Sequence, residues 1–171
     1  VLAGGKENRN DSGELEPSCG DRTPAVRAAQ IALDAGLNPV VVVLGCQAEM
    51  IKKSLGDLPV QAVFNPDFEA GQSTFLRKGV EALPIYAGAA VFLAANQPPA
   101  AADIVRTVVQ AHRQSFAPAC VPVFSGRRGN PILFDRTLFS RLTRMHGDAG
   151  GWELLEEFAS AVIEVPASIG E

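Results

Sequence analysis

The chain has 171 residues, 47% of them hydrophobic and 20% charged, a mix that is typical of one folded domain and excludes a disordered chain. Its 15 basic and 19 acidic residues give a formal net charge of −4, and no run of Lys or Arg offers a surface for nucleic acid or an anionic membrane. The longest apolar stretch, residues 87–95, is too short to cross a bilayer. Three widely spaced cysteines predict neither a disulfide framework nor a zinc site and favour a reducing cytoplasm.

Strand-like and helix-like segments alternate along the chain. Residues 40–44 form a continuous β-branched run, which is typical of a parallel strand buried on both faces. The other expected strands are residues 1–3, 60–64, 89–94, 119–124 and 162–165. Apolar residues at helical spacing predict helices over residues 24–35, 47–55, 73–83, 101–115, 137–145 and 151–158, with Ser73 as an N-cap.

This alternation predicts one three-layer α/β domain with a mostly parallel sheet over residues 1–171. We expect its first strand to begin ahead of Val1 and its C-terminal end to lie beyond Glu171. In such sheets ligands bind beyond the carboxyl ends of the strands, so the residues that follow strands are the candidates for a functional site.

The first candidate segment is residues 2–9, where a strand leads directly into Gly4 and Gly5 and then to the cations Lys6 and Arg9. Glycines let backbone N–H groups approach a phosphate, and an arginine can hold it bidentately. The segment matches neither a Walker A loop nor a dinucleotide-binding fingerprint. On pattern alone, a surface loop with incidental charge explains it equally well.

Three more segments follow predicted strands. Residues 96–98, Asn-Gln-Pro, follow an apolar strand. Their polar pair would face a ligand or metal, or the proline would simply terminate the strand. Residues 65–73 lead into a helix whose N-terminus would attract an anion, or form an ordinary capped loop. Residues 125–131 place two arginines between glycines, which suits an anionic ligand or a plain β-turn.

The remaining polar and aromatic residues carry little signal. Neither His112 nor His146 has a partner nearby in the sequence, so we expect both at the surface. Trp152 is expected to pack against the core or a helix. The sequence holds no Ser/His/Asp set, no H-E-x-x-H pattern and no EF-hand pattern.

Six segments, taken in order, resemble the motifs of the MobA-like NTP transferase family, closest to its molybdenum cofactor cytidylyltransferases. Residues 2–9 resemble the family's L-A-[AG]-G-x-S-x-R-M-G loop, and residues 42–45 resemble its second strand and turn. Residues 65–79 resemble N-P-x-W-x-x-G-x-x-S-S-L-x-x-G, and residues 96–98 stand where the family has G-D-Q-P. Residues 126–131 resemble G-x-R-G-[HN]-P, and residues 147–150 resemble G-D-x-G. Each motif alone is weak, but six in register identify the family.

The resemblance implies a nucleotide-diphospho-sugar-transferase-type, Rossmann-like fold. It also implies transfer of a nucleoside monophosphate from an NTP, with CTP favoured, to a phosphate-bearing acceptor such as molybdopterin, releasing pyrophosphate. The implied nucleotide-binding residues are Leu2, Ala3, Gly4, Gly5, Arg9, Asn65, Gly71, Ser73, Gln97 and Pro98. The implied acceptor-binding residues are Arg128, Asn130 and Asp148. Arg9 and Asn96 stand at the catalytic positions, and Asn96 is also at the position that holds Mg²⁺.

The sequence departs from the family pattern at three of these places. Asn96 replaces the aspartate of G-D-Q-P, Glu14 falls where the family has a lysine, and Phe75 replaces the second serine. An amide oxygen brings no charge to Mg²⁺, and a glutamate repels a triphosphate. The alternative is therefore a non-catalytic relative that binds a nucleotide or molybdopterin and acts as a maturation partner of a molybdoenzyme. A third reading is a nucleotidyltransferase for another small metabolite on the same fold.

Overall fold

The computed structural model describes residues 1–3, 24–95 and 102–167. The helices are α1 (Pro24–Asp34), α2 (Ala48–Leu55), α3 (Gln72–Glu81), α4 (Ala102–Ser115), α5 (Phe139–Leu142) and α6 (Gly151–Glu157). Short 3₁₀ turns are η2 (Phe68–Ala70), η3 (Arg136–Leu138) and η4 (Ala159–Ala161). The strands are β1 (Leu2–Ala3), β2 (Val41–Leu44), β3 (Gln61–Phe64), β4 (Ala89–Phe92), β5 (Ala119–Phe124), β6 (Arg127–Arg128), β7 (Ile132–Asp135) and β8 (Val162–Pro166).

The strands form one mixed sheet in which parallel pairing dominates. β1, β2 and β3 run parallel. The segment after β4 joins β1 in the same direction, because the Leu2 N–H donates to the Leu93 carbonyl at 2.8 Å and the Ala95 N–H donates to the Leu2 carbonyl at 3.0 Å. β7 lies antiparallel between β4 and β5, and β8 runs parallel to β5. The order is therefore β3-β2-β1-β4-β7-β5-β8, and within it only β7 is reversed, which confirms the mostly parallel sheet.

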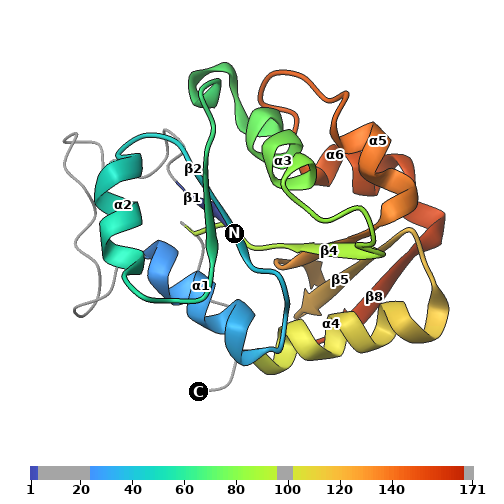
Figure 1. Cartoon of the computed structure of the whole chain (residues 1–171). Helices are drawn as coiled ribbons and strands as arrows, with labels where there is room; N and C mark the ends of the chain where they lie inside the picture. Colours follow the sequence, from blue (N-terminus) through green and yellow to red (C-terminus); the bar gives the residue numbers. More distant parts are fainter. Residues whose placement is uncertain (4–23, 96–101, 168–171) are drawn as a thin grey trace.

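Helices cover both faces of this sheet, which confirms the predicted three layers (Figure 1). On one face α3, α5 and α6 pack on the middle strands through a cluster that includes Leu76, Phe134 and Leu155. On the other face α1 and α4 pack through Ala32 and Val105. All four residues of β2 are buried, as expected of a strand with helices on both sides. In the described part of the chain no helix is long and apolar enough to span a membrane.

Sequence reasoning missed β6 and β7 and overextended one helix. β7 follows the segment interpreted as a possible turn, and its first three residues, Ile132–Phe134, are buried. A run of only three apolar residues becomes a strand through its neighbours, and here β4 and β5 supply them from distant parts of the chain. The helix predicted over residues 137–145 is the η3 turn followed by α5, which ends at Leu142.

Candidate functional site

The carboxyl ends of the parallel segments meet at one edge of the sheet. β1 ends at Ala3, β2 at Leu44 and β3 at Phe64, and the segment after β4 reaches Ala95. This carboxyl edge is where sheets of this kind bind ligands. Several predicted site residues follow Ala3 or Ala95 in the chain and lie outside the described residues: Gly4, Gly5, Arg9, Asn96, Gln97 and Pro98. Glu14 also lies outside them.

Leu2 and Ala3 reach this edge through their backbone, while their side chains belong to the core. Ala3 is 1% exposed and packs in the cluster beneath α1 and α2. Leu2 packs against the clusters on the α3 face. The Ala3 carbonyl accepts a hydrogen bond from the Gly45 N–H at 3.0 Å, which fixes the end of β1 against the end of β2.

Asn65 is the first residue after β3, and it builds the turn that leads to α3. It is 2% exposed. Its Oδ1 accepts from the Asp67 N–H at 3.1 Å, and its Nδ2 donates to the Thr74 hydroxyl at 2.8 Å. The Thr74 hydroxyl in turn donates to the Gly71 carbonyl at 2.7 Å. Asn65 thus ties the end of β3 to the first turn of α3.

Gly71 and Ser73 connect this turn to a distant loop. Gly71 has φ +112°, and a Cβ atom there would lie 2.3 Å from the carbonyl carbon of Gly147 and 2.8 Å from the Asp148 nitrogen. Ser73 is fully buried and donates both its N–H, at 3.2 Å, and its hydroxyl, at 2.7 Å, to the Gly147 carbonyl. The predicted N-cap role of Ser73 is wrong, because α3 begins at Gln72 and Gly71 occupies the N-cap position.

We call residues 71–73 together with residues 147–150 the glycine junction. Gly150 belongs to it because a Cβ atom there would lie 2.7 Å from Oε1 of Gln72. Arg77 adds a positive charge next to the same loop, since its Nη2 donates to the Met145 carbonyl at 3.1 Å. The junction brings Gly71 and Ser73, assigned to the nucleotide, next to Asp148, assigned to the acceptor. The Asp148 side chain is exposed.

Arg128 and Asn130 lie on the hairpin at the end of β5. β5 ends at the same edge as β8, which runs parallel to it. The Arg128 Nε donates to Oε1 of Glu164 on β8 at 2.7 Å. A Cβ atom on Gly129 would lie 2.6 Å from the ring of Phe124, so this ring covers the hairpin and requires a glycine there. The structure therefore pairs Arg128 with a carboxylate of β8 and does not join it to the glycine junction through any hydrogen bond among the described residues.

His112 differs from expectation, and Trp152 is not in the core, one of the two positions expected for it. His112 is only 9% exposed, and its Nε2 lies 3.0 Å from Oδ2 of Asp135 on β7. Burial alone would raise the pKa of Asp135, but hydrogen bonds from the Thr137 backbone and hydroxyl and from His112 outweigh it and hold the pKa below its usual value. Asp135 pairs with Ala89 at the start of β4, far along the strand from the carboxyl edge. Trp152 is 36% exposed and is not a core residue, whereas His146 is exposed as predicted.

Divalent metals take oxygen ligands of the kind present at this edge, namely carboxylates such as Asp148 and backbone carbonyls. Within the described ranges, no three His, Cys, Asp or Glu side chains gather closely enough to hold a metal ion.

The sheet order, the single reversed strand and the glycine-rich segments at the carboxyl edge define a nucleotide-diphospho-sugar-transferase-type fold. The profile of the MobA-like NTP transferase domain matches residues 1–162, so the chain belongs to that family. No curated protein sequence matches it.

Solved structures agree with this assignment. Rv0371c from Mycobacterium tuberculosis H37Rv superposes with a TM-score of 0.85 at 26% identity, over 99% of this chain and 86% of that one. Its manganese complex gives a TM-score of 0.82 at 22% identity, over 99% and 87%. A nucleotidyl transferase from Methanothermobacter superposes with a TM-score of 0.78 at 19% identity, over 98% of this chain and 86% of that one. CMP:2-keto-3-deoxy-manno-octonic acid synthetase, complexed with CTP, superposes with a TM-score of 0.67 at 14% identity, over 98% of this chain and 90% of that one.

Proposed function

We propose that this protein transfers a nucleoside monophosphate from an NTP to a phosphate-bearing acceptor. The observation that carries the proposal is the glycine junction, where Gly71 and Ser73 contact the Gly147 backbone next to Asp148. It holds the segment assigned to the nucleotide against the segment assigned to the acceptor at the carboxyl edge. Membership of the MobA-like NTP transferase family supports the same reaction class.

In this reaction an oxygen of the acceptor phosphate attacks the α-phosphorus of the NTP. The bond from that phosphorus to the oxygen bridging to the β-phosphate breaks, and pyrophosphate leaves. The protein's task is to align the two phosphates and to offset their charge. Asn96, as the sequence predicts, would be one of the residues that hold a divalent cation, and that cation would neutralise part of the remaining phosphate charge. Arg9 contributes a fixed positive charge to the triphosphate.

CTP as the nucleotide and molybdopterin as the acceptor are the finer parts of the proposal. The order and content of the six motifs support both, because they most resemble the molybdenum cofactor cytidylyltransferases. A structurally similar synthetase that was solved with CTP supports the base preference. Mg²⁺ is proposed as the metal, and a similar protein was solved with manganese.

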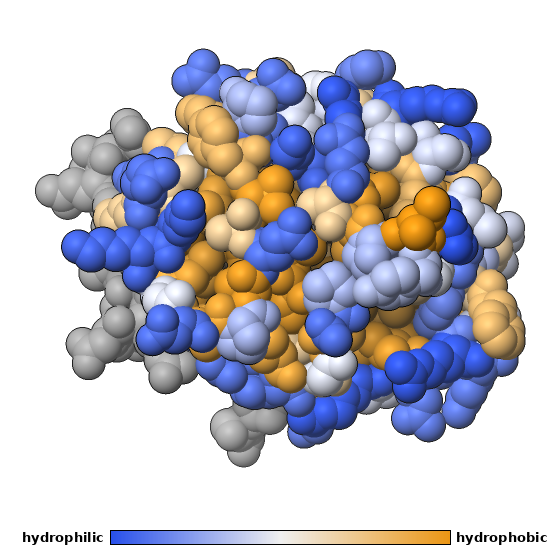
Figure 2. Space-filling view, viewed as in Figure 1, coloured by the Kyte–Doolittle hydropathy of each residue, from blue (hydrophilic) through white to orange (hydrophobic). Residues whose placement is uncertain are grey.

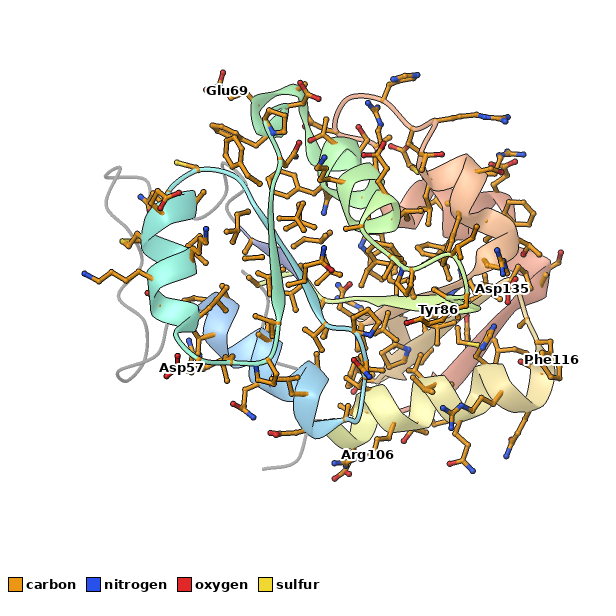
Figure 3. All side chains as sticks on the ribbon, viewed as in Figure 1. Asp57, Glu69, Tyr86, Arg106, Phe116 and Asp135 are labelled. Atoms are coloured by element: carbon orange, nitrogen blue, oxygen red, sulfur yellow. The ribbon has the colours of Figure 1, made fainter. Side chains whose placement is uncertain are left out.

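The test is pyrophosphate release in the presence of Mg²⁺, with CTP, GTP or ATP and with a molybdopterin-type phosphate as acceptor. We expect release that requires the acceptor and is fastest with CTP. Asp148→Asn should slow it, while the matched variant Asp57→Asn should not. Asp57 lies ahead of β3, at the end of this segment that is away from the carboxyl edge, whereas Glu69 lies at the other end, towards that edge (Figure 3). Equal activity of both variants would refute the assignment of Asp148.

The substitutions at positions 14 and 96 favour a second candidate, a nucleotide- or molybdopterin-binding protein that matures a molybdoenzyme without catalysis. Calorimetry separates the two. A clear heat of CTP binding without pyrophosphate release, in any acceptor mixture, would support this second candidate. Failure to bind CTP, GTP, ATP and the molybdopterin-type phosphate, with or without Mg²⁺, would refute both.

A further inference from the structure

Arg128 and Glu164 form an ion pair that crosses one strand of the sheet. The Arg128 Nε donates to Oε1 of Glu164 at 2.7 Å. Arg128 of β6 is paired with Val123 of β5, and Glu164 of β8 is paired with Val121 from the other side of β5. Directly paired residues share one face of a sheet, and so do residues two apart along a strand. The two charged groups therefore meet above β5, on the face where Val121 packs beneath α3, α5 and α6.

The pair lies towards the carboxyl edge of the sheet. Arg128 stands opposite the next-to-last residue of β5, and Glu164 lies two residues before the end of β8. β7 is antiparallel to both β4 and β5, so β4 and β5 run the same way and end at the same edge. The glycine junction is at the start of α3, and Leu76 of α3 packs in the same cluster as Val121. The ion pair and the junction therefore share one edge and one face of the sheet.

Ion pairs at the surface of a protein are common and need a comparison before one is given a role. Hydrophilic residues ring the face of the molecule that Figure 2 shows. Arg141 and Glu157 form an ion pair whose side chains are 47% and 48% exposed, whereas Arg128 and Glu164 are 29% and 49% exposed. Exposed pairs of either kind add little stability, because water screens their charges. Stabilisation alone therefore gives little reason for a carboxylate to engage an arginine of the candidate site.

Glu164 has an open space beside it into which its carboxylate can turn. It lines a hollow of about 590 Å³ at the ends of β5 and β8, together with Val123, Ser125, Gly126 and Pro166. Half of the Glu164 side chain is already in contact with water. When the carboxylate leaves Arg128, water in this hollow solvates it, so the separation leaves no buried, unpaired charge on Glu164. The ion pair can therefore open at low cost.

We propose that Glu164 competes with the acceptor phosphate for Arg128, so that the acceptor binds there only by displacing the carboxylate. This competition rests on the proposed function, which supplies the role of Arg128 and the phosphate-bearing acceptor. A phosphate monoester carries roughly −1.5 to −2 charges at pH 7 and three strong acceptor oxygens, whereas Glu164 offers a single charge. A phosphate can therefore displace the carboxylate, while a ligand with a lone carboxylate has no advantage over the one already in place.

Titration with phenyl phosphate, followed by the amide signal of Gly129 on the same hairpin, tests the competition. The Kd for phenyl phosphate should be about 3- to 10-fold lower in Glu164→Gln, because Arg128 is then free and no negative charge faces the ligand. In the assay of pyrophosphate release, the KM for the acceptor should fall by a similar factor and the KM for CTP should not change. Glu157→Gln, which frees Arg141 instead, is the matched control and should change neither value.

Two results would overturn the competition, and Arg128→Ala separates them from a failure of the proposed function. An unchanged Kd in Glu164→Gln would mean that the carboxylate does not compete, and a higher Kd would mean that it orients Arg128 for the phosphate. We expect Arg128→Ala to weaken phenyl phosphate binding and to abolish the gain from Glu164→Gln in the double variant. If Arg128→Ala leaves the Kd unchanged, Arg128 does not bind the acceptor, and that part of the proposed function fails together with the competition.

Discussion

Gly71 has a backbone conformation and a close neighbour that both demand glycine. Its φ is +112°, a region that other residues rarely adopt, and the space a Cβ would take is occupied by the Gly147 backbone. Gly56 offers a contrast, since its φ of +53° is also positive but nothing lies within 4 Å of its Cβ position. A side chain at position 71 would therefore cost both backbone strain and a clash with Gly147. The close approach of Gly71 to Gly147 also fixes the distance between the two halves of the candidate site.

Gly71→Ala should lower the free energy of unfolding by about 2–4 kcal/mol, because the chain must both strain its backbone and part from Gly147. Gly56→Ala should cost about 1 kcal/mol, since only the backbone is strained. Urea unfolding of the two variants measures the difference. Similar losses would mean that residues 71 and 147 do not approach as closely as described.

Arg9→Ala should weaken CTP binding more than Arg128→Ala does. Glu164 already accepts a hydrogen bond from Arg128, while the resemblance assigns Arg9 to the triphosphate. A charged hydrogen bond contributes roughly 1.5–3 kcal/mol, so the Kd for CTP should rise about 10- to 100-fold for Arg9→Ala. Calorimetric titration measures both variants. A larger loss for Arg128→Ala would place the triphosphate at the β5–β8 end of the edge.

Asn96→Asp should change nucleotide affinity in opposite directions with and without metal. With Mg²⁺ the new carboxylate adds a charged oxygen ligand and should tighten binding of CTP. With a chelator the same charge faces the triphosphate unshielded and should weaken binding. Titrations of the natural protein and the variant in both buffers test this. A change of the same sign in both would show that position 96 is not at the metal.

At the scale of the elements, one buried polar contact joins α4 to β7. His112 and Asp135 are both largely buried, and Asp135 also receives two hydrogen bonds from Thr137 at the start of η3. The contact lies away from the carboxyl edge, so its role is to hold the helix on the reversed strand. Because its pKa is lowered in the folded state, Asp135 links stability to pH.

The stabilisation that Asp135 provides should be present above its usual pKa of 3.8 and should disappear as the pH falls through its lower folded-state pKa. Asp135→Asn should therefore be less stable than the natural protein at pH 6, and the difference should shrink towards pH 3. Asp57→Asn, on the surface, should show no such convergence. Thermal unfolding from pH 3 to 6 measures both, and a gap that widens in acid would contradict the assignment.

The sequence predicted the elements that repeat a clear pattern, and it missed those that depend on distant contacts. Four consecutive β-branched or aliphatic residues sufficed to predict β2 as a buried strand. β7 is a strand because of β4 and β5, and the partner of His112 lies on that missed strand. Ser73 has the sequence of an N-cap, but its hydroxyl bonds a carbonyl 74 residues away. No local pattern carries that information.

Across the whole molecule the two edges of the sheet have different characters. The carboxyl edge carries the glycine junction and the residues that lead into the predicted nucleotide loop. The opposite edge carries the buried pair of His112 and Asp135 and, near them, the exposed rings of Tyr86 and Phe116 (Figure 3). Ligands of parallel sheets bind at the carboxyl edge, so we place nucleotide binding there.

Titration of isotopically labelled protein with CTP and Mg²⁺, followed by the chemical shifts of its backbone amides, tests this placement most directly. We predict that the shifts gather at the glycine junction, above all at Ser73, Gly147 and Asp148, and leave His112 and Asp135 unchanged. The junction should respond because we propose that the nucleotide and acceptor phosphates meet at its backbone. Shifts that gather around His112 and Asp135 instead, with the junction silent, would contradict the account.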